Sequence, residues 1–230
     1  MKRKFIYLMI VVFALGMVGC AKKETSGLAF KNDYESVNGK ENTHGKIHRE
    51  LNIPEDNVFV MSTAKEVLAK INNKDSFYVY FGSKLCPWCR STIVKANEMA
   101  KYRGIAKVYY VDIWDDNGEE ILRDKYVLDD NNKPVLEKEG TSEYKEFLKL
   151  FDGLLKEYTL TDKDNKKISV GEKRIYAPNY VYIDKGVAKK LVTGISELQK
   201  DSREELTTEI LKDEEKIFDD FFTEVCDDSC

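Results

Sequence analysis

The chain has 230 residues, of which 42% are hydrophobic and 34% are charged, and its formal net charge is −4 at pH 7. This length suits one ordinary domain with additions. Because the lysines are interleaved with aspartate and glutamate along the chain, they form no basic patch of the kind that nucleic-acid binding requires. We therefore predict no nucleic-acid partner.

The N-terminus has the pattern of an export signal, with a basic head at residues 2–4 and an apolar run over residues 5–18. A membrane span needs about 20 apolar residues, so this shorter run is more typical of a signal-peptide core. The run ends in small residues before Cys20, and this end resembles the lipobox of bacterial lipoproteins. The resemblance implies a signal peptide over residues 1–19, lipidation of Cys20 and a lipid anchor on the outer face of the bacterial cytoplasmic membrane. The alternatives are an ordinary cleaved signal and an uncleaved anchor that contains a cysteine.

A polar segment follows the signal. Lysine, glutamate, asparagine, glycine and serine dominate residues 20–53 without apolar periodicity, so we expect a flexible tether. His44 and His48 lie four residues apart in this segment, a spacing that could serve a metal, but we interpret them as solvated histidines. We predict that the folded domain begins at Pro54 and extends over residues 54–230.

The first half of this domain alternates strand and helix patterns. Runs rich in β-branched and aromatic residues predict buried strands, and apolar residues at helical spacing predict the helices between them. In chain order we expect a strand over 57–62, a helix over 63–75, a strand over 76–82, a helix over 90–104 and a strand over 106–114. These elements predict a β-α-β unit with a right-handed crossover.

The second half contains an insertion at about residues 120–170, which is long compared with ordinary connections. In chain order we expect a short helix over 119–128, a turn over 129–134, an amphipathic helix over 142–158, a hairpin over 159–170, and two strands over 180–183 and 187–192. Ser202 and Glu205 have capping-box spacing, which predicts a C-terminal helix from Arg203.

The segment GSKLCPWCRS, residues 82–91, contains two of the five cysteines. Cysteines at this spacing bind a metal, form a structural disulfide or exchange electrons with other thiols. A helix N-terminus stabilises a thiolate, and Cys86 would occupy that position with Lys84 and Arg90 nearby to add positive potential. We therefore assign Cys86 as the nucleophile and Cys89, one turn inside the helix, as the resolving thiol.

The strand and turn over 77–89, FYVYFGSKLCPWC, resemble the active site of the thioredoxin superfamily. The second mark of that family is a cis-proline before a pair of strands, and the segment over 176–194 matches it with Ala177–Pro178. The lipoprotein signal, the CPWC sequence and a C-terminal cysteine pair further resemble thioredoxin-like lipoproteins of Gram-positive bacteria, some of which are labelled bacteriocin transport accessory proteins. The resemblance implies an α/β thioredoxin fold, a mixed central sheet flanked by helices, with the insertion before the cis-proline strand.

The resemblance also implies roles for single residues. The Ala177 backbone would pair with the extended chain of a bound substrate, and Pro178 would shield Cys86. We expect Trp88, between the two cysteines, to cover the sulfurs and contact substrate. Tyr80 stands where thioredoxins proper carry a buried aspartate, so the proton of the resolving thiol needs another route here.

The C-terminal sequence CDDSC places Cys226 and Cys230 four residues apart. Helical positions four apart have Cβ atoms about 5–6 Å apart, whereas a disulfide needs roughly 3.5–4.5 Å. A bridge between them therefore requires a turned or frayed end. We interpret the pair as a local clip on the tail, and a second redox couple is the alternative.

Together these patterns predict an extracytoplasmic, membrane-tethered thiol–disulfide oxidoreductase that uses no small-molecule cofactor and no metal. Its partners would be exported thiol or disulfide proteins and a membrane or extracytoplasmic protein that supplies or removes electrons. The alternatives are an accessory binding module of the same fold, which docks a secreted peptide or export machinery through its insertion, and a metal-trafficking lipoprotein. The CPWC turn between strand and helix and the matching Ala-Pro segment favour redox chemistry over a zinc site. The direction of electron flow depends on the reduction potential and is left open.

Overall fold

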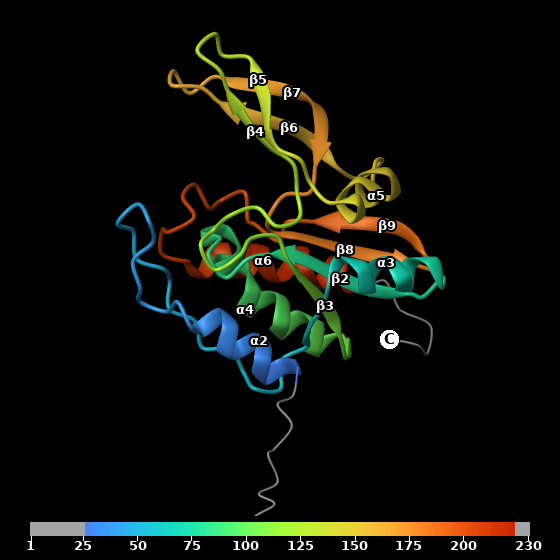
Figure 1. The fold of residues 1–230 in the computed structure, drawn as a ribbon. Coiled ribbons are helices and arrows are strands. Elements are labelled where there is room, and N and C mark those ends of the chain that lie inside the picture. The colour runs from blue at the N-terminus through green and yellow to red at the C-terminus, as the bar shows by residue number, and fades with distance from the viewer. Residues whose placement is uncertain (1–25, 224–230) are drawn as a thin grey trace, which may run out of the picture.

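The computed structural model describes residues 26–223. Five strands form one sheet in the order β1-β3-β2-β8-β9 (Figure 1). They are β1 (Phe59–Met61), β2 (Phe77–Gly82), β3 (Val108–Asp112), β8 (Asn179–Asp184) and β9 (Val187–Val192). β1, β3 and β2 run parallel, whereas β8 and β9 are antiparallel to their neighbours. The chain therefore has a mixed α/β fold around a mixed sheet, as the sequence predicts.

β2 is the centre of the sheet, and all six of its residues are buried. Its side chains alternate between two apolar clusters, so that Tyr78 and Tyr80 belong to one cluster and Phe77, Val79 and Phe81 to the other. Helices cover both clusters, and this explains why the strand is a continuous apolar run in the sequence.

The helices of the described chain are α2 (Ser26–Glu35), α3 (Ala64–Asn72), α4 (Pro87–Tyr102), α5 (Ser142–Leu150) and α6 (Thr208–Phe221). α2, α4 and α6 pack on the face of the sheet that carries Tyr78, and α3 and α5 pack on the face that carries Phe77 (Figure 1). α3 begins with a capping box between Thr63 and Glu66, which satisfies backbone N–H groups at its first turn. Across residues 26–223, no helix has the length and apolar character that a membrane crossing requires.

The expectation of a flexible tether up to residue 53 is wrong for the part of that segment the structure describes. α2 lies within it, and its Phe30 and Tyr34 side chains are fully buried in the same cluster as Tyr78. These two aromatic residues are four apart and lie on one face of the helix, where they fill the core beside β1. The folded domain therefore already includes Ser26 and does not begin at Pro54.

Two hairpins project from one side of the molecule (Figure 1). They consist of β4 (Lys125–Leu128) with β5 (Pro134–Lys138), and of β6 (Lys156–Thr161) with β7 (Lys167–Arg174). The hairpin predicted over 159–170 is confirmed and is longer than expected. The short helix predicted over 119–128 is wrong, because Lys125–Leu128 pairs with β5 across a turn in which the Asp129 side chain accepts hydrogen bonds from two backbone N–H groups.

The helices predicted over 142–158 and from Arg203 are both shorter than expected. α5 ends at Leu150 and not at residue 158, since the chain from Lys156 onward pairs in β6. α6 begins after Thr207, whose side chain accepts a hydrogen bond from the Ile210 N–H, and not at Arg203. The Glu204 carboxylate instead accepts from the N–H groups of residues 200 and 201, which holds that stretch in turns.

Candidate active site

The turn between β2 and α4 places Cys86 at the start of the helix. Cys86 is the N-cap residue of α4, and Pro87 occupies the first helical position, where its missing N–H group costs nothing. The Cys86 Sγ accepts a hydrogen bond from the Cys89 N–H at 3.4 Å. The first sulfur therefore lies at the positive end of the helix dipole, where a thiolate is stabilised.

The cis-proline segment closes the site from the other side. The Ala177–Pro178 peptide bond is cis, as the sequence predicts. The Cys86 thiol donates a hydrogen bond to the Ala177 carbonyl oxygen at 3.4 Å. Cys86 and Cys89 are both free thiols, and they are 3% and 0% exposed. The structure thus brings together Cys86, Cys89, Ala177 and Pro178 from segments about ninety residues apart in the chain.

The two thiols have pKa values shifted in opposite directions. Burial alone would raise the pKa of Cys86, but hydrogen bonds from the Cys89 thiol and from the Cys89 and Trp88 backbone N–H groups, together with the charge of Arg123, lower it below its ordinary value. Burial raises the pKa of Cys89 well above its ordinary value, and the neighbouring Cys86 sulfur raises it further. Cys86 is therefore the thiol that ionises first and the better nucleophile.

Lys84 and Arg90 are not among the groups that chiefly lower the pKa of Cys86, although the charge of Arg90 interacts with Cys89. Lys84 Nζ pairs with Asp33 at 2.7 Å and with Asp116 at 2.6 Å, so its charge is neutralised. The Arg90 guanidinium is buried and donates to backbone carbonyl oxygens, among them that of Tyr34 at 2.8 Å. It fixes the N-terminal segment to α4, which is a structural role.

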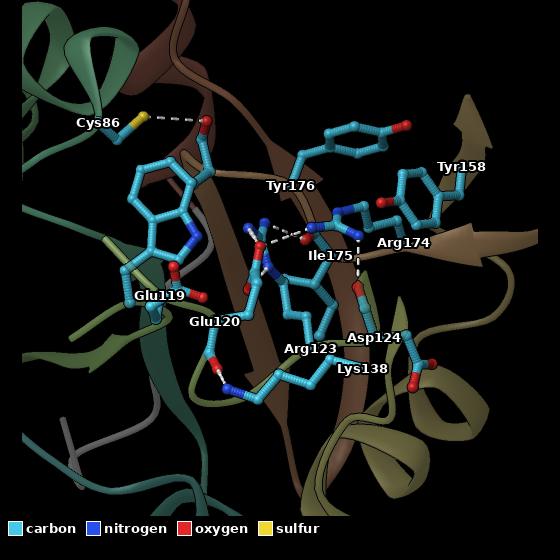
Figure 2. A network of polar contacts seen from close by, with 12 residues as sticks. Cys86, Glu119, Glu120, Arg123, Asp124, Lys138, Tyr158, Arg174, Ile175 and Tyr176 are labelled. Carbon is cyan, nitrogen blue, oxygen red and sulfur yellow. Dashed lines mark hydrogen bonds and ion pairs between the residues drawn. The ribbon is translucent and has the colours of Figure 1, made fainter. Parts of the chain in front are cut away.

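The charge of Arg123, which the sequence did not suggest, contributes to the lowered pKa of Cys86 after the hydrogen bonds. Arg123 is 4% exposed, and its Nη1 donates to the Ile175 carbonyl oxygen at 3.0 Å. Figure 2 shows Arg123 within a network of polar contacts beside Ile175, two residues before the carbonyl oxygen that contacts Cys86. Nothing in the local sequence marks this arginine, because it lies more than thirty residues after the cysteine turn in a stretch that we predicted to be a short helix.

Tyr80 lies on β2 beside the inner thiol. Its hydroxyl lies 2.8 Å from the Tyr34 hydroxyl, and it also hydrogen-bonds the Cys89 thiol, which works against the raised pKa of Cys89. The same hydroxyl packs directly over Gly82, where a Cβ atom would come within 2.2 Å of it. A buried tyrosine hydroxyl, which pairs with a second one on α2, is therefore one of the polar groups in contact with the inner thiol, together with the Ser83 backbone.

Asp112 is an acidic residue close to the buried side chains of Tyr34 and Tyr110. Burial raises the pKa of Asp112, at the end of β3, to about 6, although a hydrogen bond from the Trp114 N–H partly opposes the rise. Asp112 pairs with Gly82 in the register of β2 and β3, so its carboxyl lies close to the start of the cysteine turn. This group is able to exchange a proton near neutral pH.

A cavity of about 460 Å³ opens beside the two cysteines. Trp88, Ala177 and Pro178 line it, so the three residues predicted to bind substrate share one wall. Residues of the second hairpin and of the sheet edge complete it: Lys156, Glu157, Thr159, Lys167, Tyr176, Asn179, Leu191, Thr193 and Ile195. Its lining combines charged, polar and apolar side chains.

No group of three or more metal-ligating side chains is assembled within residues 26–223. Of the two histidines that we expected in solvent, His44 is exposed, but His48 is only 5% exposed. Burial lowers the pKa of His48, and the charges of Arg90 and Arg203 lower it further, so this histidine is a neutral packing residue at neutral pH. The predicted lipidation site Cys20 and the pair Cys226 and Cys230 lie outside the described residues.

Comparison with protein-family models gave no match to this chain, and comparison with curated proteins gave none either.

Proposed function

We propose that this chain has a thioredoxin fold and is a membrane-tethered thiol–disulfide oxidoreductase with Cys86 and Cys89 as its redox pair. The observation that carries the proposal is the contact between Cys86 Sγ and the Ala177 carbonyl oxygen at 3.4 Å. It sets a thiol at a helix N-terminus against a cis-proline segment, beside a second, buried thiol. A structural disulfide is a weaker explanation, because a four-residue loop constrains the unfolded chain very little.

In the reducing direction, the Cys86 thiolate attacks one sulfur of a substrate disulfide. The substrate S–S bond breaks, a Cys86–substrate disulfide forms, and the second substrate sulfur leaves as a thiolate that takes up a proton. Cys89 then loses its proton and attacks Cys86 Sγ, which releases the remaining substrate thiolate and forms the Cys86–Cys89 disulfide. Two electrons pass from the pair to the substrate, and the oxidising direction is the reverse of these steps.

The opposed pKa shifts suit this order of events. Cys86 ionises first, so it attacks while Cys89 is still protonated. The negative charge of Cys86 raises the pKa of Cys89, and that contribution disappears once Cys86 is bound in the mixed disulfide. Cys89 therefore becomes easier to deprotonate at the moment when its thiolate is needed, next to the Tyr80 hydroxyl.

We place this activity outside the cytoplasm, with Cys20 as the lipid anchor. The substrates would be exported proteins with thiols or disulfides, and a second extracytoplasmic or membrane thiol protein would supply or remove the electrons. An extended polypeptide segment in the cavity beside Trp88 and Pro178 would present its cysteine to Cys86.

A trapping experiment tests the proposal. The Cys89→Ser variant cannot resolve the intermediate, so we expect exported proteins to accumulate in disulfides with Cys86, where peptide mass spectrometry identifies them. The matched control, Cys86→Ser, should trap none. If Cys89→Ser captures no protein through Cys86, the enzyme proposal fails. If in addition Cys86→Ser leaves the cellular phenotype intact, the projecting hairpins favour the accessory binding module instead.

A further inference from the structure

The segment before the cis-proline is held at two points. Cys86 Sγ donates to the Ala177 carbonyl oxygen at 3.4 Å, and two residues earlier Arg123 Nη1 donates to the Ile175 carbonyl oxygen at 3.0 Å. Figure 2 shows the Arg123 network at one end of this segment and the Cys86 thiol at the other. Between them, the Tyr176 N–H donates to the Asn179 side chain at 2.7 Å, so the whole segment is fixed.

Arg123 is itself held rigidly. Its Nε donates to Glu120 Oε2 at 2.9 Å, and a second guanidinium nitrogen pairs with the other oxygen of the same carboxylate. The guanidinium carbon lies 5.7 Å from the centre of the Trp114 ring, and Trp114 packs against the apolar cluster that contains Cys86. A bidentate contact and an aromatic neighbour fix both the position and the orientation of this buried charge.

Arg174 shares the Glu120 carboxylate with Arg123, at 2.8 Å from Oε1. One buried carboxylate thus faces two buried guanidinium groups, so it does not neutralise both. Arg174 differs from Arg123 in its other contacts, since it donates to the Asp124 carbonyl oxygen at 2.7 Å and lies over the Tyr158 ring at 4.0 Å. It ties the two hairpins together and does not contact the carbonyl oxygen of Ile175.

We propose that Arg123 is a positioning residue of the thiol pair, through which the base of the insertion fixes the cis-proline segment and supplies the positive charge opposite Cys86. The inference rests on the proposed function, since it assigns the charge that a reactive Cys86 needs. Arg123 donates to the Ile175 carbonyl oxygen, and the Ala177 carbonyl oxygen, two residues later, contacts the Cys86 sulfur. Glu120 also pairs with Arg174, so it balances only part of the Arg123 charge. The insertion is therefore part of the redox site and not only an appended surface.

The direct test is the pH profile of Cys86 alkylation by iodoacetamide, measured on the reduced full chain by peptide mass spectrometry. Arg123→Met removes the charge and the contact with the Ile175 carbonyl oxygen but keeps an unbranched side chain. We expect its alkylation midpoint to move to higher pH and the Cys86 rate at pH 7 to fall at least about threefold, because only the thiolate reacts. The matched control, Arg174→Met, removes a guanidinium from the same carboxylate but keeps the Arg123 contact with the Ile175 carbonyl oxygen. Because Glu120 then balances more of the Arg123 charge, we expect a shift in the same direction that is clearly smaller than that of Arg123→Met.

Two results would overturn the inference. One is an unchanged midpoint in an Arg123→Met variant whose circular dichroism spectrum is native. The other is an equal shift in Arg123→Met and Arg174→Met, which would assign the effect to general loosening of the insertion. If the methionine variant does not fold, Arg123→Gln is judged by the same criteria. Alkylation of Cys86 needs no redox partner, so the two experiments are independent. If Cys89→Ser traps no protein but the alkylation midpoint of Arg123→Met is shifted, the proposed function is rejected and the role of Arg123 in Cys86 ionisation stands.

Discussion

Phe30 on α2 gives the sharpest test of how the N-terminal segment is built into the domain. Its side chain is fully buried and stacks on Tyr34 and Phe59, with ring centres 4.4 Å and 4.5 Å away, and it meets Tyr110 edge-on at 5.1 Å. Phe30→Ala leaves a cavity among three rings. Buried Phe→Ala changes cost about 3–5 kcal/mol, and lost ring pairs add to that cost, so we expect a loss of about 4 kcal/mol.

The assay is thermal and urea unfolding of the purified protein, followed by circular dichroism. For a domain of this size, about 4 kcal/mol corresponds to a fall in Tm of about 8–16 °C. The matched control is Ile47→Ala in the same N-terminal segment, where the side chain is 61% exposed and the change should stay within about 0.5 kcal/mol. If Phe30→Ala costs less than about 1 kcal/mol, α2 does not pack in the core, and the tether interpretation of this segment stands.

Two further predictions concern buried polar side chains, the Tyr80 hydroxyl and the Glu214 carboxyl. Tyr80→Phe removes the hydroxyl that contacts Cys89, so we expect a higher pKa of the Cys89 thiol and slower release of mixed disulfides. Tyr34→Phe keeps the contact between Tyr80 and Cys89, so its effect should be smaller. Equal effects of the two variants would contradict the role assigned to Tyr80. Glu214 on α6 is fully buried, neither carboxylate oxygen has a hydrogen-bond partner in the described part of the chain, and burial raises its pKa from 4.5 to about 8. The folded state then holds a proton that the unfolded state has lost, so the free energy of unfolding should fall as the pH rises from about 4.5 to 8, by on the order of 2–4 kcal/mol. Glu214→Gln should remove this contribution and leave the smaller fall below about pH 6 that the raised pKa of Asp112 produces. Urea unfolding at a series of pH values measures the free energy of unfolding. A wild-type value that does not change over that range would refute the raised pKa of Glu214.

The sequence predicts the central sheet and the cysteine turn well, because these parts are determined locally. A strand such as Phe77–Gly82, buried on both faces, is a continuous apolar run, and Pro87 after Cys86 marks a helix start. The cis bond at Ala177–Pro178 followed from a motif that spans the turn and the later strand pair. In the strand and at the helix start a few neighbouring residues decide the structure, whereas the cis bond was expected from the resemblance alone.

The packing of α2 was not predictable in the same way. Besides Gly27, only Phe30 and Tyr34 are buried on it, so the helix shows almost no apolar periodicity. It is held by contacts that are distant in the sequence, such as the Arg90 guanidinium on the Tyr34 carbonyl oxygen. Tertiary contacts of this kind override a composition that favours a tether.

The insertion was misjudged for a related reason. Residues 119–128 contain apolar residues at helical spacing, but the Asp129 turn and the partner strand β5 determine a hairpin. Arg123 became a site residue only through this topology, which carries it to the Ile175 carbonyl oxygen. Its role depends on pairing between strands, which periodicity along one segment does not reveal.

The most direct measurement for the central claim is a redox titration of Cys86 and Cys89. The purified chain is equilibrated in dithiothreitol buffers of defined potential, free thiols are alkylated, and the Cys86–Cys89 disulfide is quantified by peptide mass spectrometry. The account predicts one reversible two-electron transition, with a tenfold change in the oxidised-to-reduced ratio for about every 30 mV. Thiols that remain reduced at every potential, or a disulfide that forms and cannot be reduced again, would contradict it.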